Sequence, residues 1–155
     1  MKHAKGAMAV GLGMLVAAAG GIGCEDEDDA PQVSITSPNA GSTHTLGESM
    51  RIRVSFRTDD FEIEQDCGEE VNCGRAYLTI DGGACNQPGT DYNNVLLDAD
   101  LDETRSMEAL FDLCPAATRT GAHTITISLR YNNGGMVTGE AGAPAQASIT
   151  LQTTP

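Results

Sequence analysis

The chain has 155 residues, in which 22 Asp and Glu outnumber nine Lys and Arg, so its formal net charge at pH 7 is −13. This acidic balance excludes nucleic acid as a partner, because nucleic-acid binding requires clustered cations that displace the counterions of the phosphates. It also disfavours close contact between the protein surface and anionic lipid.

Residues 1–23 have the features of an export signal peptide. Lys2 and Lys5 are the only lysines of the chain, an apolar stretch follows at residues 7–19, and no acidic residue precedes Glu25. A charged start, a short apolar segment and small residues before the cleavage point are typical of secretory signals. The segment is too short and too rich in glycine for a membrane span, so we expect it to be removed on export.

The junction after this segment is similar to a known processing site. Gly21-Ile22-Gly23-Cys24 resembles the lipobox of bacterial lipoproteins, in which the cysteine sulfur receives diacylglycerol and a dedicated peptidase then frees the cysteine amino group. The resemblance implies that residues 1–23 are a lipoprotein signal peptide and that lipid on Cys24 attaches the protein to a membrane. Two or more acyl chains, each contributing about 0.8 kcal/mol per buried methylene, would make that attachment stable. The alternative is an ordinary secretory cleavage after Ala17-Ala18-Ala19, which leaves Cys24 as a free thiol.

The cysteine count favours lipidation. The chain has five cysteines, and an odd cysteine in an exported protein needs an explanation. Lipidation of Cys24 accounts for it and leaves four cysteines to form disulfides in an oxidising compartment, namely Cys67, Cys73, Cys85 and Cys114. A zinc site at Cys67 and Cys73 is a competing interpretation, but their spacing is wide for a zinc knuckle and exported thiols tend to oxidise.

Residues 24–31 form an acidic tether in this interpretation. Acidic residues run without interruption from Glu25 to Asp29, and Pro31 follows shortly after them. A segment with this charge and no large apolar residue cannot bury enough surface to fold, so we interpret it as a solvated connection. Residues 32–155 then have the length of a single domain with a moderate core.

The hydrophobic pattern of residues 32–155 has a period of two rather than 3.6. Apolar residues alternate with Arg and Ser in residues 50–57, and with Thr, Ser and Arg in residues 123–131. This alternation predicts strands with one buried and one solvated face. Seven short strands separated by Gly, Asn, Asp and Pro turns predict an all-β, antiparallel sandwich. The other five candidate strands are residues 33–36, 75–81, 95–99, 107–113 and 147–153.

Three segments of this domain resemble the bacterial immunoglobulin-like modules of secreted and surface proteins. They are residues 31–38 with the glycines that follow, residues 121–127 with the Asn132-Asn133-Gly134-Gly135 turn, and residues 147–151. The resemblance implies an antiparallel Greek-key β-sandwich of the immunoglobulin-like type with about seven strands, spanning residues 32–155. The chain departs from antibody domains because it has no Trp and no cysteine in the middle of its second or sixth strand.

A Greek-key order narrows the three possible pairings of four cysteines. If successive strands alternate in direction, Cys67 and Cys73 share the loop between the second and third strands. Cys85 and Cys114 follow the third and fifth strands, so they fall at the opposite end of the sandwich. We therefore favour disulfides Cys67–Cys73 and Cys85–Cys114, of which the longer-range one stabilises the fold by about 3 kcal/mol through loop closure.

The same order gathers two acidic loops at the end of the sandwich next to the tether. We favour a solvated surface that keeps an exported protein soluble. Calcium binding is the alternative, because calcium takes six to eight oxygen ligands. Residues 98–102 resemble the start of an EF-hand loop, but Glu103 and Ala109 stand where that loop requires Gly and Glu. The acidic residues of the two loops are Asp59, Asp60, Glu62, Glu64, Asp66, Glu69, Glu70, Asp98, Asp100, Asp102 and Glu103.

The sequence offers little for catalysis. Only His44 and His123 follow the leader, and no nucleophile elbow, HExxH motif or phosphate-binding glycine loop occurs. We expect a non-enzymatic lipoprotein of the bacterial cell envelope, anchored to the membrane through Cys24 and needing no cofactor. It would serve as a binding or structural module for an unknown protein or glycan partner. The alternatives are a secreted hydrolytic enzyme and a calcium-dependent adhesion module.

A row of arginines lies on the solvated face of the predicted strand at residues 50–57. Arg51, Arg53 and Arg57 alternate with its apolar residues. We expect them to pair with acids on a neighbouring strand, since opposite charges across strands contribute roughly 0.2 to 1 kcal/mol. A patch for an anionic partner is the alternative.

Overall fold

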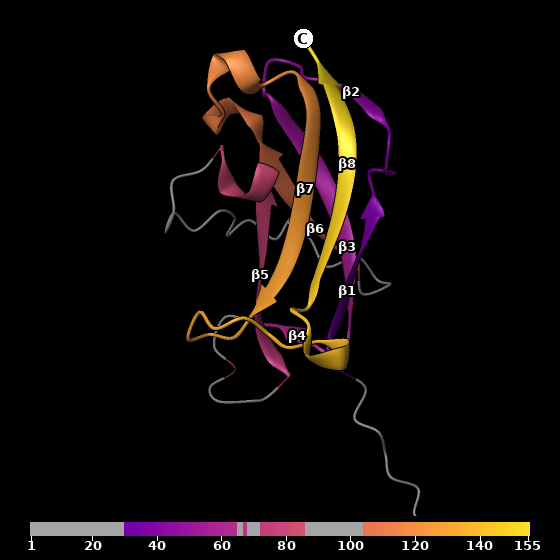
Figure 1. Cartoon of the computed structure of the whole chain (residues 1–155), viewed down its shortest axis with the longest axis vertical. Coiled ribbons are helices and arrows are strands. Elements are labelled where there is room, and N and C mark those ends of the chain that lie inside the picture. Colours follow the sequence, from indigo (N-terminus) through magenta and orange to yellow (C-terminus); the bar gives the residue numbers. More distant parts are fainter. Residues whose placement is uncertain (1–29, 65–66, 68–71, 86–103) are drawn as a thin grey trace, which may run out of the picture.

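Eight strands in two facing sheets make up the described part of the chain, which comprises residues 30–64, 67, 72–85 and 104–155 of the computed structural model. The strands are β1 (Gln32–Ser37), β2 (Thr43–Thr45), β3 (Arg51–Asp59), β4 (Glu62–Ile63), β5 (Cys73–Ile80), β6 (Arg105–Leu110), β7 (Gly121–Arg130) and β8 (Gln146–Thr154). Figure 1 shows the strands running lengthwise, with the start of β1 near one end, here called the lower end, and the C-terminus at the upper end.

The smaller sheet contains three antiparallel strands in the order β1-β3-β6. The central strand has the predicted alternation, because Ile52, Val54 and Phe56 are buried while its arginines are exposed. The register places Met107 and Ala109 of β6 opposite two of these buried residues. Directly paired residues point to the same side of a sheet, so one face of this sheet is apolar and the other carries the arginines.

The larger sheet has five strands in the order β2-β8-β7-β5-β4 and is mixed. β7 pairs antiparallel with β5 and β8, whereas β2 runs parallel to β8 and β4 parallel to β5. The prediction of a purely antiparallel sandwich is therefore wrong at both edges of this sheet. At one edge the chain leaves β1 through the Ser37–Pro38 cis peptide bond and continues alongside β8. At the other edge Asp60, with φ of 53°, turns the chain after β3, so that β4 runs in the direction of β5.

Six of the seven predicted strands are present, as β1, β3, β5, β6, β7 and β8. The predicted strand at residues 107–113 extends too far, because β6 ends at Leu110 and Phe111–Leu113 form a 3-10 turn. The predicted strand at residues 95–99 lies outside the described residues. β2 and β4 were not expected, because three and two residues are too few to display a period of two.

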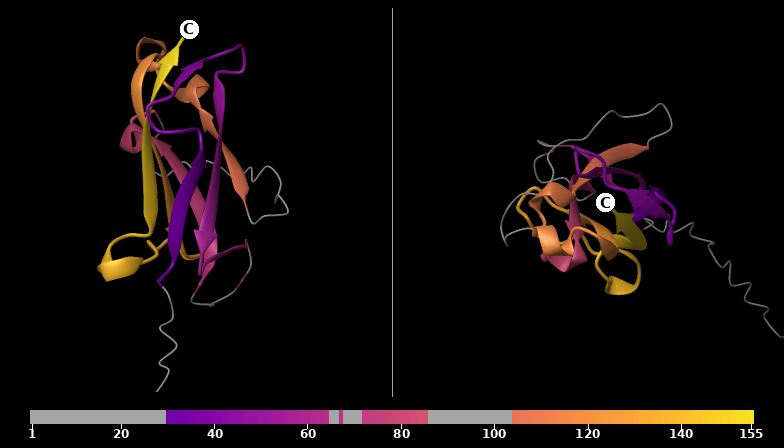
Figure 2. Two further views of the ribbon diagram at one scale, coloured as in Figure 1. Left: turned by 90° about the vertical axis from the view of Figure 1, so that its right-hand side faces the viewer. Right: turned by 90° about the horizontal axis from the view of Figure 1, so that it is seen from above.

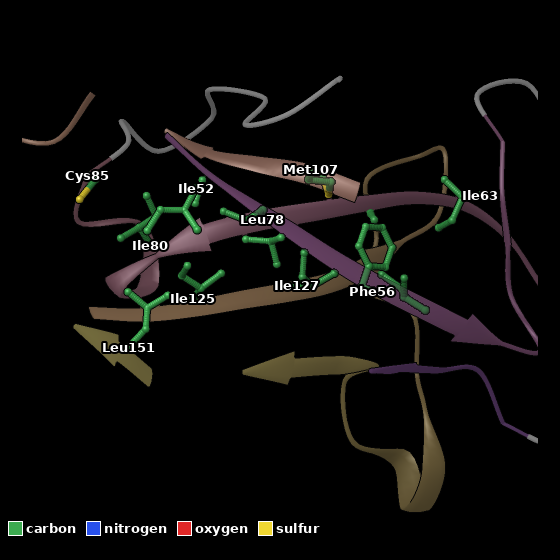
Figure 3. Close-up of a cluster of buried hydrophobic side chains, with 14 of the residues drawn as sticks. Ile52, Phe56, Ile63, Leu78, Ile80, Cys85, Met107, Ile125, Ile127 and Leu151 are labelled. Atoms are coloured by element: carbon green, nitrogen blue, oxygen red, sulfur yellow. The ribbon is translucent and has the colours of Figure 1, made fainter. Parts of the chain in front are cut away.

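The core fills the space between the two sheets. Figure 3 shows Ile52 and Phe56 of β3 together with Leu78 of β5 and with Ile125 and Ile127 of β7. The last four of these side chains are 0% exposed. Figure 2 shows the sheets from the side, with β1 next to β8, so the first and last strands of the domain close one side of the sandwich.

Two disulfides lie at opposite ends of this core. Cys67–Cys73 joins the loop after β4 to the first residue of β5, and Cys85–Cys114 joins the segments that follow β5 and β6. Figure 3 shows Cys85 at the far end of the core from Ile63 of β4. These two disulfides are the pair favoured on the basis of the predicted strand order. Two disulfides suggest an oxidising, extracytoplasmic environment.

Replacing Phe56 by Ala should lower the free energy of unfolding by about 3–5 kcal/mol, because the loss of a buried ring combines lost burial with a cavity. Urea unfolding followed by circular dichroism measures the change. Gln152→Ala, on the exposed face of β8, is the matched control and should stay within about 0.5 kcal/mol of the parent. A Phe56→Ala variant as stable as the control would contradict the core described above.

The two disulfides should stabilise the fold unequally. Their partners are 29 and 6 residues apart, and chain-entropy loss on loop closure gives about 3.6 kcal/mol for the longer loop and about 2.2 kcal/mol for the shorter one. We therefore expect the Cys85→Ser/Cys114→Ser variant to unfold at lower urea than the Cys67→Ser/Cys73→Ser variant. The reverse order would show that the contributions are not set by loop length.

Candidate functional site

Part of the predicted acidic end is present in the described structure. β3 ends at the lower end, and β1, β5 and β6 begin there, as the predicted strand order requires. Four exposed acids lie at this end: Asp59, Asp60, Glu62 and Glu64. Cys24, residues 25–29 of the tether and the remaining predicted acids lie outside the described residues, the acids being Asp66, Glu69, Glu70, Asp98, Asp100, Asp102 and Glu103.

The described residues contain no arrangement of three His, Cys, Asp or Glu side chains that could hold a metal ion. Most acids of the calcium hypothesis lie beyond those residues, so calcium binding stays an untested prediction. None of the helices in the described residues is long and apolar enough to cross a bilayer.

His123 lies inside the upper half of the sandwich. Its side chain is 4% exposed, its Nδ1 lies 2.7 Å from Asp81 Oδ2, and its ring meets the Phe111 ring edge to face at 4.9 Å between centroids. Asp81 Oδ1 also accepts a hydrogen bond of 2.8 Å from the Thr124 backbone N–H. One carboxylate thus ties the turn after β5 to β7, which gives this buried histidine a structural role.

The second ring nitrogen of His123 has no route to a substrate in this arrangement. Its Nε2 is buried and has no hydrogen-bond partner among the described residues. A general base must come within hydrogen-bonding reach of the proton that it abstracts. An enclosed nitrogen next to an aromatic ring does not meet that condition, so the geometry favours packing over catalysis.

His44 lies in β2 and is partly exposed. Its Nε2 is 2.8 Å from Ser42 Oγ, two residues earlier in the chain. None of the ion pairs among the described residues includes His44, so no described carboxylate orients the ring as the third member of a catalytic triad would.

The arginine row on β3 is only partly neutralised. Arg51 pairs with Glu108 at 3.0 Å and with Asp112 at 3.8 Å, which confirms ion pairing across the sheet for this residue. Arg57 Nε instead donates to Thr104 Oγ1 at 3.2 Å. Arg53 stands opposite Glu108 in the register, but the described ion pairs do not include it. Two of the three predicted ion-paired arginines thus lack a described carboxylate partner.

A cavity of about 450 Å³ opens at the lower end, where the end of β3, the short β4 and the start of β6 meet. Phe61 and Ile63 provide its apolar surface and are 5% and 7% exposed. The polar lining combines two carboxylates with one guanidinium, an amide and a hydroxyl, contributed by Asp60, Glu62, Arg105, Asn72 and Thr58. The volume falls within the range of small-molecule sites, which is roughly 300–1,000 Å³.

Arg105 occupies an unusual position in this lining. Arg105 pairs with Phe56 in the register, and it precedes Met107 by two residues and Ala109 by four. Phe56, Met107 and Ala109 are all buried on the inner face of the small sheet. Because alternate residues of a strand share a face, β6 directs Arg105 toward the inside of the sandwich. Its side chain is half-buried, and none of the ion pairs among the described residues includes it.

Arg105 is not among the predicted site residues, although the hydrophobic pattern contains a signal for it. Arg105, Met107 and Ala109 continue a period of two, in which an arginine stands where an apolar residue is expected. The predicted strand began at residue 107, so Arg105 was left out of the pattern. A charge on the inner face of a strand indicates either a protected sheet edge or a binding function.

Comparison of the chain with protein-family models and with curated proteins finds no match in either case.

Replacing Asp81 by Ala should destabilise the upper half of the sandwich. The change leaves the buried His123 Nδ1–H and the more exposed Thr124 N–H without their acceptor, and an unsatisfied buried donor costs about 1–3 kcal/mol. We expect the urea midpoint to fall clearly. Asp112→Ala removes a carboxylate whose only described ion pair is at 3.8 Å on the surface, and it should change stability by less than about 1 kcal/mol. Equal effects of the two changes would rule out the structural role assigned to Asp81.

Proposed function

We propose that this protein is a non-enzymatic lipoprotein of the bacterial cell envelope, anchored through lipid on Cys24, whose immunoglobulin-like domain binds a partner outside the cytoplasm. The observation that carries the proposal is the pair of disulfides at opposite ends of the sandwich. Disulfides form and persist in oxidising compartments. An exported domain is what the signal-like residues 1–23 and the lipobox-like junction at Cys24 also imply.

The strand order supports an immunoglobulin-like assignment. In that fold the first, second, fourth and fifth strands lie in one sheet, and the third, sixth and seventh lie in the other. The fourth strand would fall within residues 86–103, which lie outside the described residues. β1, β3 and β6 form the small sheet, while β5, β7 and β8 are neighbours in the large one. This matches the immunoglobulin-like order if β2 and β4 are taken as short additions at the edges of the large sheet.

An anchor at Cys24 would set the orientation of the domain on the membrane. The described domain begins at residue 30, at the lower end, and its last strand ends at the upper end (Figure 1). An anchor just before residue 30 would hold the lower end nearest the membrane and extend the sheets away from it. The cavity beside β4 would then lie near the anchored end, and the outer faces of both sheets would be open to a partner.

The histidines favour a binding module over the alternative of a hydrolytic enzyme. His123 is enclosed and His44 has no described acidic partner. Binding requires only a complementary surface, whereas hydrolysis requires an accessible nucleophile, base or metal. Fold alone does not separate these functions, because β-sandwiches host both.

Intact-mass analysis of the protein extracted from its native membrane tests the proposal. We expect the mass of residues 24–155 plus acyl groups, with a gain of four hydrogens on reduction of the two disulfides. The Cys24→Ser variant should lose the acyl mass and leave the membrane fraction or accumulate unprocessed, whereas Ser34→Ala should behave as the parent. An unlipidated chain that begins near Gly20 would overturn the anchor and make the protein a secreted domain with a free thiol.

A further inference from the structure

We propose that the cavity at the lower end binds a basic amino acid, or a small molecule with the same charges, through its carboxylate and its two cationic groups. The proposal rests on the proposed role of the domain as a binding module and names the chemistry of one of its ligands. Three features of the cavity support this assignment: the inward direction of Arg105, the apolar surface beside it and the charge of its rim.

Arg105 would provide the carboxylate-binding group. The register places it on the inner face of β6, opposite Phe56, which is fully buried. Its guanidinium has no described ion-pair partner, although Asp60 and Glu62 line the same cavity. A half-buried guanidinium lacking a counter-charge is a strong donor for a carboxylate, because guanidinium and carboxylate form paired, charge-assisted hydrogen bonds.

Phe61 and Ile63 would contact the carbon chain of the ligand. Both are more than nine-tenths buried and belong to the core, yet both also line the cavity. Apolar surface next to an oriented cation is the usual composition of a small-molecule site, in which a few polar groups fix orientation and apolar groups contribute burial. The arrangement suits a molecule with an aliphatic chain attached to its carboxylate.

The charge of the rim selects a cationic ligand over other carboxylates. Among the described lining residues, Asp60 and Glu62 carry two negative charges against one positive charge on Arg105, which gives a sum of −1. A basic amino acid at neutral pH carries +1 and complements this sum, whereas a dicarboxylate would meet repulsion from both rim acids.

Isothermal titration of the full processed chain with L-lysine and L-arginine tests the proposal. We expect saturable binding of at least one of them, little binding of cadaverine, which lacks the carboxylate, and little binding of L-glutamate, which has the wrong charge. Arg105→Gln should weaken binding about ten- to hundredfold, the range expected for losing a hydrogen bond to a charged group. Arg53→Gln, which removes an exposed arginine from the outer face of the same sheet, should leave affinity unchanged.

Two further variants keep the test decisive. Glu62→Gln should weaken binding of the cationic ligand but less than Arg105→Gln, and melting curves would verify that each variant is folded. If Arg105→Gln does not fold, Arg105→Lys replaces it and should still reduce affinity, because an ammonium lacks the planar pair of donors. The protein could instead bind neither amino acid while its Arg105→Gln variant self-associates. That result would show that Arg105 prevents the edge strand β6 from pairing with another molecule.

The outcomes separate this proposal from the proposed function. Loss of the lipid anchor in the mass experiment would leave amino-acid binding by the secreted domain intact. Absence of saturable binding of both amino acids, or undiminished binding by Arg105→Gln, would overturn the ligand assignment while leaving the anchored binding module in place.

Discussion

The rest of the structure depends on the burial of one face of β3 against β5 and β7. Phe56 and Leu78 are fully enclosed between the sheets, and each sheet can bury only one side of its strands. Because the side-chain period of a strand is two, a shift of one residue would turn every apolar side chain outward. The register of β3 with β6 therefore also decides that Arg105 points inward, and this same constraint creates the candidate site.

The sequence was most informative where burial alternates over many residues. β3 and β7 contain nine and ten residues, long enough for a period of two to stand out from chance. β2 and β4 are visible only in three dimensions, because their existence depends on neighbours that are far away in sequence, such as β8 for β2. Their parallel direction follows from where the chain turns, and a pattern of apolar residues does not encode that.

The candidate sites differ in how far local sequence can reveal them. The disulfide partners could be predicted from the strand order, because each loop must lie at one of the two ends of the sandwich and only cysteines at the same end can pair. The burial of His123 could not, since it depends on Asp81 and Phe111, which reach it from two other segments. The cavity is harder still, because its lining comes from β3, β4 and β6 and from residues between them.

The distribution of charge connects the cavity to the acidic character of the chain. The chain has 22 acidic and nine basic residues, and acids at the surface increase its solubility. Because carboxylates outnumber cations, an arginine that lies near one can form an ion pair. Arg51 does so across the small sheet, on a solvated face where ion pairs are weak. Arg105 lies on the opposite face, beside two rim acids, and still has no described carboxylate within pairing distance. Its guanidinium lines an open cavity without a described counter-charge, so it is available to the anionic group of a ligand, which is the role proposed for it.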